Sequence, residues 1–286
     1  MAGAVNSLEI GSSSLFFNPA GMANMDNFID ITASNNKWIA DIQHNAFSLA
    51  LSPKRGYYGV LGFTAQSVDY GDKFYGTIVD GSEQGYADTG DLNPSAMAFG
   101  VGYAKALSDR FSVGGQVRWV KQDLGSFVVP ETDSTSSEES FDLTVASFDF
   151  GTLYKTGFKS LTFGMSVRNF SQEIEYIEES FQLPLVFTLG ISMDLMDFFR
   201  ESSIEQSMKM SIDATHDRSY AEQILVGLDY KVMNLLSLRG GYATSNDESG
   251  LAFGFGVSQF GLALDYAYTP FGVFDNVQRA TVRFSF

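Results

Sequence analysis

The sequence predicts an all-β protein, a transmembrane antiparallel β-barrel of about 14 strands preceded by a short N-terminal segment. Three observations support this fold class. Apolar residues recur at every second position, short and long connections alternate, and only 18% of the 286 residues are charged. Soluble domains usually carry roughly 25% charged residues. A membrane-crossing strand needs only about 9–11 residues, and every second one faces the lipid.

The last strand shows the alternation most clearly. In residues 278–286, Val282, Phe284 and Phe286 fall on one face, and Arg283 falls on the other. Only an extended strand separates two such sets. The same alternation predicts strands at 28–34, 43–52, 56–68, 94–106, 110–122, 142–155, 160–170, 182–194, 207–215, 223–231, 235–243, 250–257, 260–269 and 278–286. A short amphipathic helical turn is expected within residues 195–205.

The connections between these strands alternate in length. The short ones are 52–56, 106–110, 155–159, 232–235 and 258–260, and the long ones are 35–42, 69–93, 123–141, 171–181, 216–222, 244–249 and 270–277. Transmembrane barrels have short periplasmic turns and longer outer loops, so this order predicts which end faces outward. The connection 194–206 is an exception, because it is long for a periplasmic turn.

Composition excludes several classes of protein. The net charge of −16 argues against nucleic acid as a partner, because phosphate binding needs clustered lysine and arginine. The absence of cysteine excludes disulfides, thiolate metal ligands and a thiol nucleophile, and two histidines are too few for a histidine-rich metal site. We expect no cofactor and no metal. The sequence contains no uninterrupted apolar run of about 18 residues, so it predicts no transmembrane helix. No cleavable secretion signal is recognisable in the first residues, so an exported protein would be shown here in mature or trimmed form.

A soluble β-sandwich would also alternate, but its outward face would be rich in lysine and glutamate. Here the polar faces of the strands are rich in Gly, Ala, Ser and Thr, which fits the crowded inside of a barrel. A few charged residues remain on these faces, and we expect them to line the lumen as paired wall charges: Arg118, Asp149, Arg168, Asp213, Asp229, Arg239, Asp265, Arg279 and Arg283. An enzyme is not expected, because no nucleophile signature lies near His44 or His216.

The N-terminal segment carries the most specific motif, Asn18-Pro19-Ala20-Gly21. An Asn-Pro pair begins a turn, and glycine permits close backbone approach. The motif precedes the first strand, so residues 1–27 are predicted to form a plug segment inside a barrel of residues 28–286. Alternatively, the motif is only a structural turn that closes the lumen.

This motif resembles the NPA motif of FadL-type outer-membrane proteins. Further matches resemble the PorV/PorQ branch of these proteins: Asp149-Phe150-Gly151-Thr152-Leu153-Tyr154, Val167-Arg168-Asn169-Phe170, Leu183-Pro184-Leu185, Leu189-Gly190-Ile191-Ser192, Leu238-Arg239-Gly240-Gly241-Tyr242 and Leu264-Asp265-Tyr266-Ala267-Tyr268. Their order and spacing cover nearly the whole chain. The resemblance implies a FadL-like barrel in the outer membrane of a Gram-negative bacterium, in contact with outer-membrane lipid.

The resemblance also implies alternative functions. PorV-like proteins accompany cargo of the type IX secretion system, so the main hypothesis is a non-enzymatic barrel that takes part in protein transport. Its partner would be a secreted cargo or a secretion-system protein. FadL relatives move hydrophobic molecules, so the second hypothesis is a passive transporter of small hydrophobic molecules. The third is a structural barrel that organises the outer membrane.

The long loops are acidic. Residues 69–93, 131–142 and 171–181 contain many carboxylates and almost no cations. Under the main hypothesis, these loops contact the protein partner. Calcium binding is an alternative, but the loops lack the spaced ligands and the glycine of a defined calcium loop, so solvated loops that repel one another are favoured.

Overall fold

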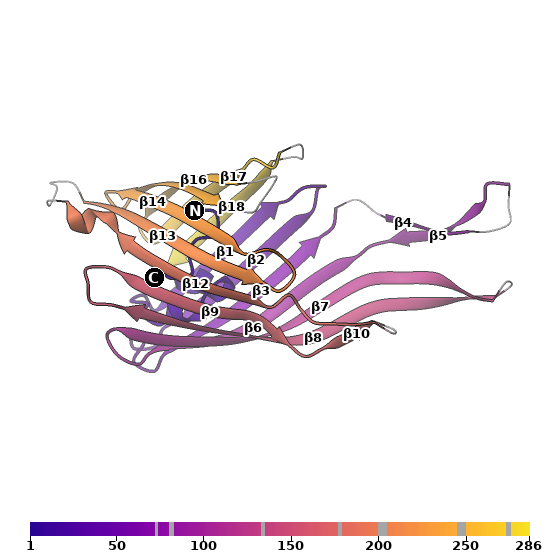
Figure 1. Ribbon diagram of the computed structural model, residues 1–286, viewed down its shortest axis with the longest axis horizontal. Helices are drawn as coiled ribbons and strands as arrows, with labels where there is room; N and C mark the ends of the chain where they lie inside the picture. The colour runs from indigo at the N-terminus through magenta and orange to yellow at the C-terminus, as the bar shows by residue number, and fades with distance from the viewer. Residues whose placement is uncertain are drawn as a thin grey trace.

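The computed structural model describes residues 1–71, 74–79, 83–132, 135–176, 179–199, 205–244, 250–272 and 276–286. Its main sheet is a closed antiparallel barrel of fourteen strands (Figure 1). The barrel strands are β1 (Ile29–Lys37), β2 (Gln43–Leu51), β3 (Val60–Asp69), β6 (Ser95–Ala106), β7 (Phe111–Thr132), β8 (Thr135–Lys155), β9 (Thr162–Ser171), β12 (Val186–Asp194), β13 (Gln206–Asp217), β14 (Gln223–Val232), β15 (Leu236–Ala243), β16 (Leu251–Gln259), β17 (Leu262–Thr269) and β18 (Val277–Ser285). The predicted fold class is confirmed.

The barrel closes where β1 pairs with β18. Asp30 lies opposite Ser285 and Lys37 lies opposite Gln278 in this antiparallel pair. Ile29 and Phe286 extend it by donating their backbone N–H groups to each other's carbonyls at 2.9 Å. A closed barrel leaves no strand edge, which is the condition for placing a β-sheet in hydrocarbon.

Apolar side chains cover the outside of the barrel. On β6, Phe99 is 55% exposed and Tyr103 is 44% exposed, whereas the alternate residues Ala98 and Ala104 are buried. The same alternation leaves Phe253 on β16 exposed. A soluble sandwich buries its apolar face between two sheets. This barrel instead turns that face outward, as a barrel surrounded by lipid does.

The structure differs from the prediction at the long connections. β7 extends to Thr132 and β8 begins at Thr135, so these two paired strands occupy the described residues of 123–141, a stretch that was expected to form a loop. Two further hairpins lie within expected loops: β4 (Phe74–Val79) with β5 (Tyr86–Leu92), and β10 (Ile174–Tyr176) with β11 (Glu179–Phe181). Such hairpins satisfy their backbone groups by pairing and need no apolar face, so alternation does not reveal them. The β7–β8 extension and β4–β5 project from the same end of the barrel (Figure 1).

Helical structure is limited to three 3₁₀ turns in the described residues, η1 (Gly11–Phe16), η2 (Pro19–Met22) and η3 (Leu195–Phe198). The helical turn expected within 195–205 is therefore the four-residue η3, and residues 200–204 lie outside the described part of the chain. Across that described part, no helix has the length and apolar character needed to span a bilayer.

Candidate functional site

The N-terminal segment, residues 1–28, runs along the inner wall of the barrel, and its start lies within the outline of the barrel in Figure 1. Asp213 on β13 accepts the backbone N–H groups of Val5 and Asn6 through one carboxylate oxygen, both at 2.8 Å. The amide of Asn6 donates to the backbone carbonyl of Thr188 at 3.1 Å and accepts from the hydroxyl of Ser166 at 2.6 Å. These bonds tie the beginning of the chain to β9, β12 and β13.

The Asn18-Pro19-Ala20-Gly21 motif forms η2 and its cap. The side-chain oxygen of Asn18 accepts the backbone N–H of Ala20 at 3.1 Å, and Pro19 occupies the first turn, where its missing N–H carries no penalty. The side-chain nitrogen of Asn18 donates to the carbonyl of Asn6 at 2.8 Å and to that of Thr152 on β8 at 3.0 Å. One buried asparagine thus links two parts of the N-terminal segment to the wall.

Glycines provide the room for this contact. At each of these wall positions a β-carbon would collide with the N-terminal segment: Gly62, Gly102, Gly114, Gly151, Gly164, Gly227 and Gly241. Leu15 fits between Gly62 and Gly102, and Asn18 lies directly on Gly151. The small residues noted on the polar faces are therefore a docking track for residues 1–28.

Arg118 and Asp149 form a buried pair on β7 and β8. The Nε atom of Arg118 lies 2.8 Å from Oδ2 of Asp149, and Nη2 lies 2.9 Å from Oδ1. Asp149 also accepts the backbone N–H of Asn169 at 2.8 Å and the side-chain amide of Gln116 at 3.3 Å. The carboxylate is 1% exposed, and these donors replace the water it loses.

A second pair joins the first and last strands. Arg283 on β18 donates from Nε to Oδ2 of Asp30 at 2.7 Å. The other oxygen of Asp30 accepts the backbone N–H of Ser12 at 2.9 Å and its hydroxyl at 2.7 Å. Sequence reasoning missed Asp30, although it alternates with Ile29 and Ile31 and so falls on the polar face of β1.

Arg239 on β15 contacts two carboxylates. Its Nε lies 3.3 Å from Asp229 on β14, and its Nη1 lies 2.5 Å from Asp265 on β17. Gly256 on β16 leaves space for this contact, because a β-carbon there would collide with Asp265. These three charged side chains, the Arg239 triad, lie along the inner wall and are each 22–28% exposed.

The remaining predicted lumen charges have no ion pair in the described part of the chain. Asp213 holds backbone N–H groups, as described above. Arg168 donates to the carbonyl of Phe16 at 2.6 Å. Arg279 has neither an ion pair nor a hydrogen bond among the described residues. The wall thus contains three groups of paired charges together with charges that act alone or on the N-terminal segment.

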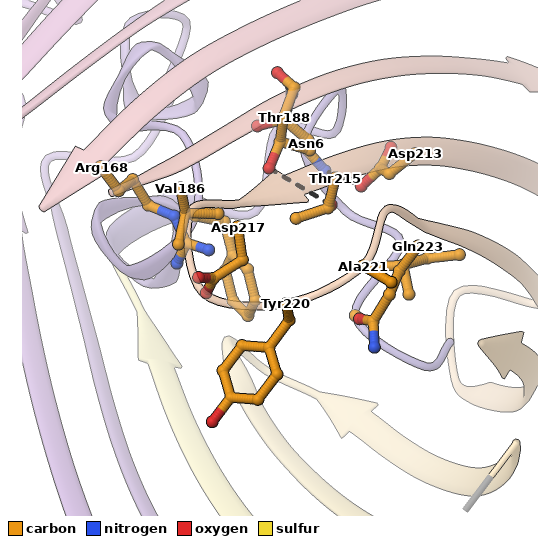
Figure 2. A pocket seen from close by; sticks show the side chains of 13 residues that line it. Asn6, Arg168, Val186, Thr188, Asp213, Thr215, Asp217, Tyr220, Ala221 and Gln223 are labelled. Atoms are coloured by element: carbon orange, nitrogen blue, oxygen red, sulfur yellow. Dashed lines mark hydrogen bonds between the residues drawn. The ribbon is translucent and has the colours of Figure 1, made fainter. Parts of the chain in front are cut away.

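Four cavities lie beside the N-terminal segment, and one of them, of about 300 Å³, is lined by Ser7, Leu8, Glu9 and Ser160 among others. The Tyr220 cavity, of about 270 Å³, is lined by Phe17, Arg168, Val186, Asp217 and Leu225 among others (Figure 2). In Figure 2, Arg168, Asp217 and Tyr220 are gathered on one side, and the hydroxyls of Thr188 and Thr215, 3.3 Å apart, are on another.

The other two cavities lie along β14–β18. The Arg279 cavity, of about 390 Å³, reaches Trp38 and Thr269 near the end of the barrel with the long connections. The Lys231 cavity, of about 440 Å³, reaches Asn234 and Phe260 in the short turns. The two cavities share Arg239 and Asp265 in their linings.

The histidines do not form a catalytic group. The ring of His44 lies 6.3 Å from that of Trp38, and Nδ1 of His216 lies 3.3 Å from Glu222 on the surface. No hydrogen bond joins either histidine to a serine or threonine within the described residues. This geometry offers no activated nucleophile.

The fold and the lined lumen define a closed fourteen-strand barrel of the kind found among outer-membrane channels. Two solved structures are similar over nearly their whole length. The toluene transporter TodX of Pseudomonas putida is 14% identical, with 100% of this chain and 96% of that chain covered and a TM-score of 0.61. A Pseudomonas aeruginosa FadL homologue is 13% identical, with 99% and 96% covered and a TM-score of 0.58. No family model matches the chain, and no curated protein matches it.

Proposed function

We propose that this protein is a bacterial outer-membrane barrel that passively transports small hydrophobic molecules. The observation that carries the proposal is a lumen in which a fixed N-terminal segment leaves cavities along one side. The similar structures support it, since one is described as a toluene transporter and another as a monoaromatic hydrocarbon channel. This function was the second hypothesis from the sequence.

Phe17 supports this reading through its position. It lines both the Tyr220 cavity and the Arg279 cavity, so one aromatic side chain faces both spaces. Val186 and Leu225 add apolar surface to the first cavity, and Trp38 adds it to the second. Pockets for small apolar ligands combine such apolar walls with a few polar groups that fix orientation.

The N-terminal segment would act as a plug in this function. It contacts the wall from β1 to β13 and is held by Asp30, Asp213 and Asn18. A solute that enters from the outer end would meet this segment before reaching the short turns. The role of the motif would then be to anchor the plug rather than to bind the solute.

Uptake by lipid vesicles tests the proposal. Purified barrel in vesicles should admit toluene faster than empty vesicles do, and Phe17→Asp should reduce the gain because a carboxylate faces both cavities. Phe260→Asp is a matched control, since Phe260 lies exposed in a short turn, at the end of the Lys231 cavity alone. Equal uptake by barrel-containing and empty vesicles would contradict the proposal.

A second candidate function is the PorV/PorQ-like one, in which the protein binds a secreted cargo or a secretion-system protein. The observation that favours it is the β7–β8 extension, which projects well beyond the barrel (Figure 1). Asp123, Glu139 and Asp142 lie on this extension, and Lys121 is the cation nearby. The acidic residues Asp72, Asp80, Asp133 and Glu178 of the long connections lie outside the described residues.

Pull-down in mild detergent tests this candidate. The barrel should recover a secretion-system component or its cargo from its own cells, and a variant that lacks residues 126–140 should lose it. Recovery of no such protein would contradict the partner hypothesis. Deletion of the gene without any effect on secretion or uptake would favour a structural barrel instead.

A further inference from the structure

In the Lys231 and Arg279 cavities, the carboxylates have ion-pair partners among the described residues and several of the basic side chains do not. Lys209, Lys231 and Arg279 line the Lys231 and Arg279 cavities, and none of them has an ion pair within the described residues. They occupy inward positions, since Lys209 alternates with the buried Ser211 and Lys231 alternates with Asp229. Unpaired positive charge therefore faces both cavities.

The carboxylates of the same two cavities are all engaged. Asp229 and Asp265 belong to the Arg239 triad. An oxygen of Glu9 lies 2.8 Å from Nζ of Lys155. Arg283, which lines the Lys231 cavity, forms an ion pair with Asp30. The triad carries one net negative charge, and the three cations Lys209, Lys231 and Arg279, unpaired among the described residues, outnumber it, so the two cavities carry an excess of positive charge although the chain carries a net charge of −16. Cavities with low-dielectric walls concentrate the field of such charges and attract ions of opposite sign.

The two cavities lie beside the N-terminal segment, which lines one of them through Glu9 and the other through Phe17. No hydrogen bond joins residues 1–28 to β16 or β17 in the structure as described. One cavity reaches the short turns and the other reaches the long connections. The linings share Arg239 and Asp265 and no other residue, so the triad lies at the junction between them.

We propose that this side of the lumen is a path for small, water-soluble anions, and that the Arg239 triad is its narrowest point. Lys231 and Lys209 attract the anion at the short-turn end, and Arg279 attracts it at the other end. Between these two ends, Asp229 and Asp265 hold Arg239 against the wall, and the triad carries one net negative charge that opposes the anion at the narrowest point. Rings of basic side chains select anions in pores by the same physics. The Arg279 cavity belongs to both proposals, whereas the Tyr220 cavity belongs to hydrophobic transport alone and the Lys231 cavity to the anion path alone.

Planar-bilayer recording with a potassium chloride gradient tests the proposal. The reversal potential of the wild-type barrel should show a preference for chloride over potassium. The double variant Lys209→Glu and Lys231→Glu should lower the chloride-to-potassium permeability ratio at least about threefold. The matched control is Lys54→Glu with Lys105→Glu, which makes the same change of charge at the same end of the barrel but outside both cavities.

A neutral triad tests the narrow point. Arg239→Gln combined with Asp229→Asn and Asp265→Asn removes the three charges together, so no charge is left unpaired in the wall. This variant should conduct more than the wild type while it keeps its chloride preference. If the wild type carries no current and the triple variant carries a chloride-selective current, the triad is a closed gate, and this result also supports the path.

Other outcomes would overturn the proposal. They are a potassium preference in the wild type, a selectivity that the Lys209 and Lys231 changes do not alter, an unchanged current in the triple variant, or no current in either protein. Heat-resistant migration of each variant in a gel confirms that its barrel is folded. Because chloride current and toluene uptake are separate measurements, either proposal can fail without the other.

Discussion

The polar and charged residues of the inner wall find their partners in different ways on the two sides of the barrel. Along β1–β13, glycines and buried carboxylates receive most of the N-terminal segment, and Gly227 on β14 and Gly241 on β15 receive Met1. Along β14–β18, the wall charges bind one another or face cavities. The packed side gains rigidity from fully satisfied polar groups. The open side keeps partly exposed charges, which can meet a solute. One lumen can thus hold a fixed segment and still contain cavities beside it.

The largest expected difference between the two sides is the loss in free energy of unfolding when a wall carboxylate is removed. Asp149→Ala would leave Arg118 buried without its partner, which costs about 3–5 kcal/mol. Asp265→Ala on the open side leaves Arg239 with Asp229, and water screens the loss, so its cost should be about 1 kcal/mol or less. Urea unfolding in lipid vesicles, followed by tryptophan fluorescence, measures both. Equal costs would show that the two sides are not energetically distinct.

The next prediction concerns the anchor of the N-terminal segment. Asp213→Leu removes the acceptor of two backbone N–H groups, each bond to a charged group being worth about 1.5–3 kcal/mol. Because the chain has no cysteine, Ser7→Cys gives a single reporter at a position that is 2% exposed. Thiol labelling of this reporter should rise at least about tenfold in the Asp213 variant, since 1.4 kcal/mol corresponds to tenfold.

Asp265→Leu serves as the control for that measurement. It removes a carboxylate of the open side that makes no hydrogen bond or ion pair to residues 1–28 within the described part of the chain, so labelling at position 7 should not change. A rise of the same size in this control would mean that the segment is loosened by any loss of wall charge, and the distinction between the sides would fail.

A smaller effect is expected from the glycine track. Gly151→Val places its side chain where the amide oxygen of Asn18 lies, and overpacking of this kind costs about 1–3 kcal/mol. Gly240→Val on β15 meets nothing within 4 Å and should have no comparable cost. The unfolding experiment above compares the two. If both substitutions are tolerated equally, Asn18 is free to move and the track does not position the segment.

The barrel itself could be predicted from the sequence because lipid imposes a simple pattern. Every predicted strand corresponds to a strand of the barrel, since residues such as Phe99 and Phe253 must alternate with small or polar ones. The β7–β8 extension could not be predicted in this way. Outside the membrane its backbone pairing needs no apolar face, so its residues follow no such pattern.

The site was predictable only in part. Arg118 and Asp149 could be assigned to the polar faces by alternation, but their partners depend on how neighbouring strands are aligned. Asp30 carries the same signal on β1, and only the structure shows that it binds Ser12 and Arg283. The docking of Asn6 and Asn18 is a long-range contact that strand periodicity cannot encode.

The smallest expected effect is a change in the pKa of Asp197, which lies at the short-turn end of the barrel and belongs to neither side of the inner wall. Ser160 donates its hydroxyl and its backbone N–H to Asp197 in η3, and these bonds hold the pKa of Asp197 below its usual value. A depressed pKa stabilises the fold above the unfolded value of about 3.9 and loses this effect as pH falls below it. Ser160→Ala removes the hydroxyl donor and keeps the backbone N–H, so it should raise the NMR titration midpoint of Asp197 above that of the wild type. An unshifted midpoint in the wild type would show that water, rather than Ser160, solvates this carboxylate.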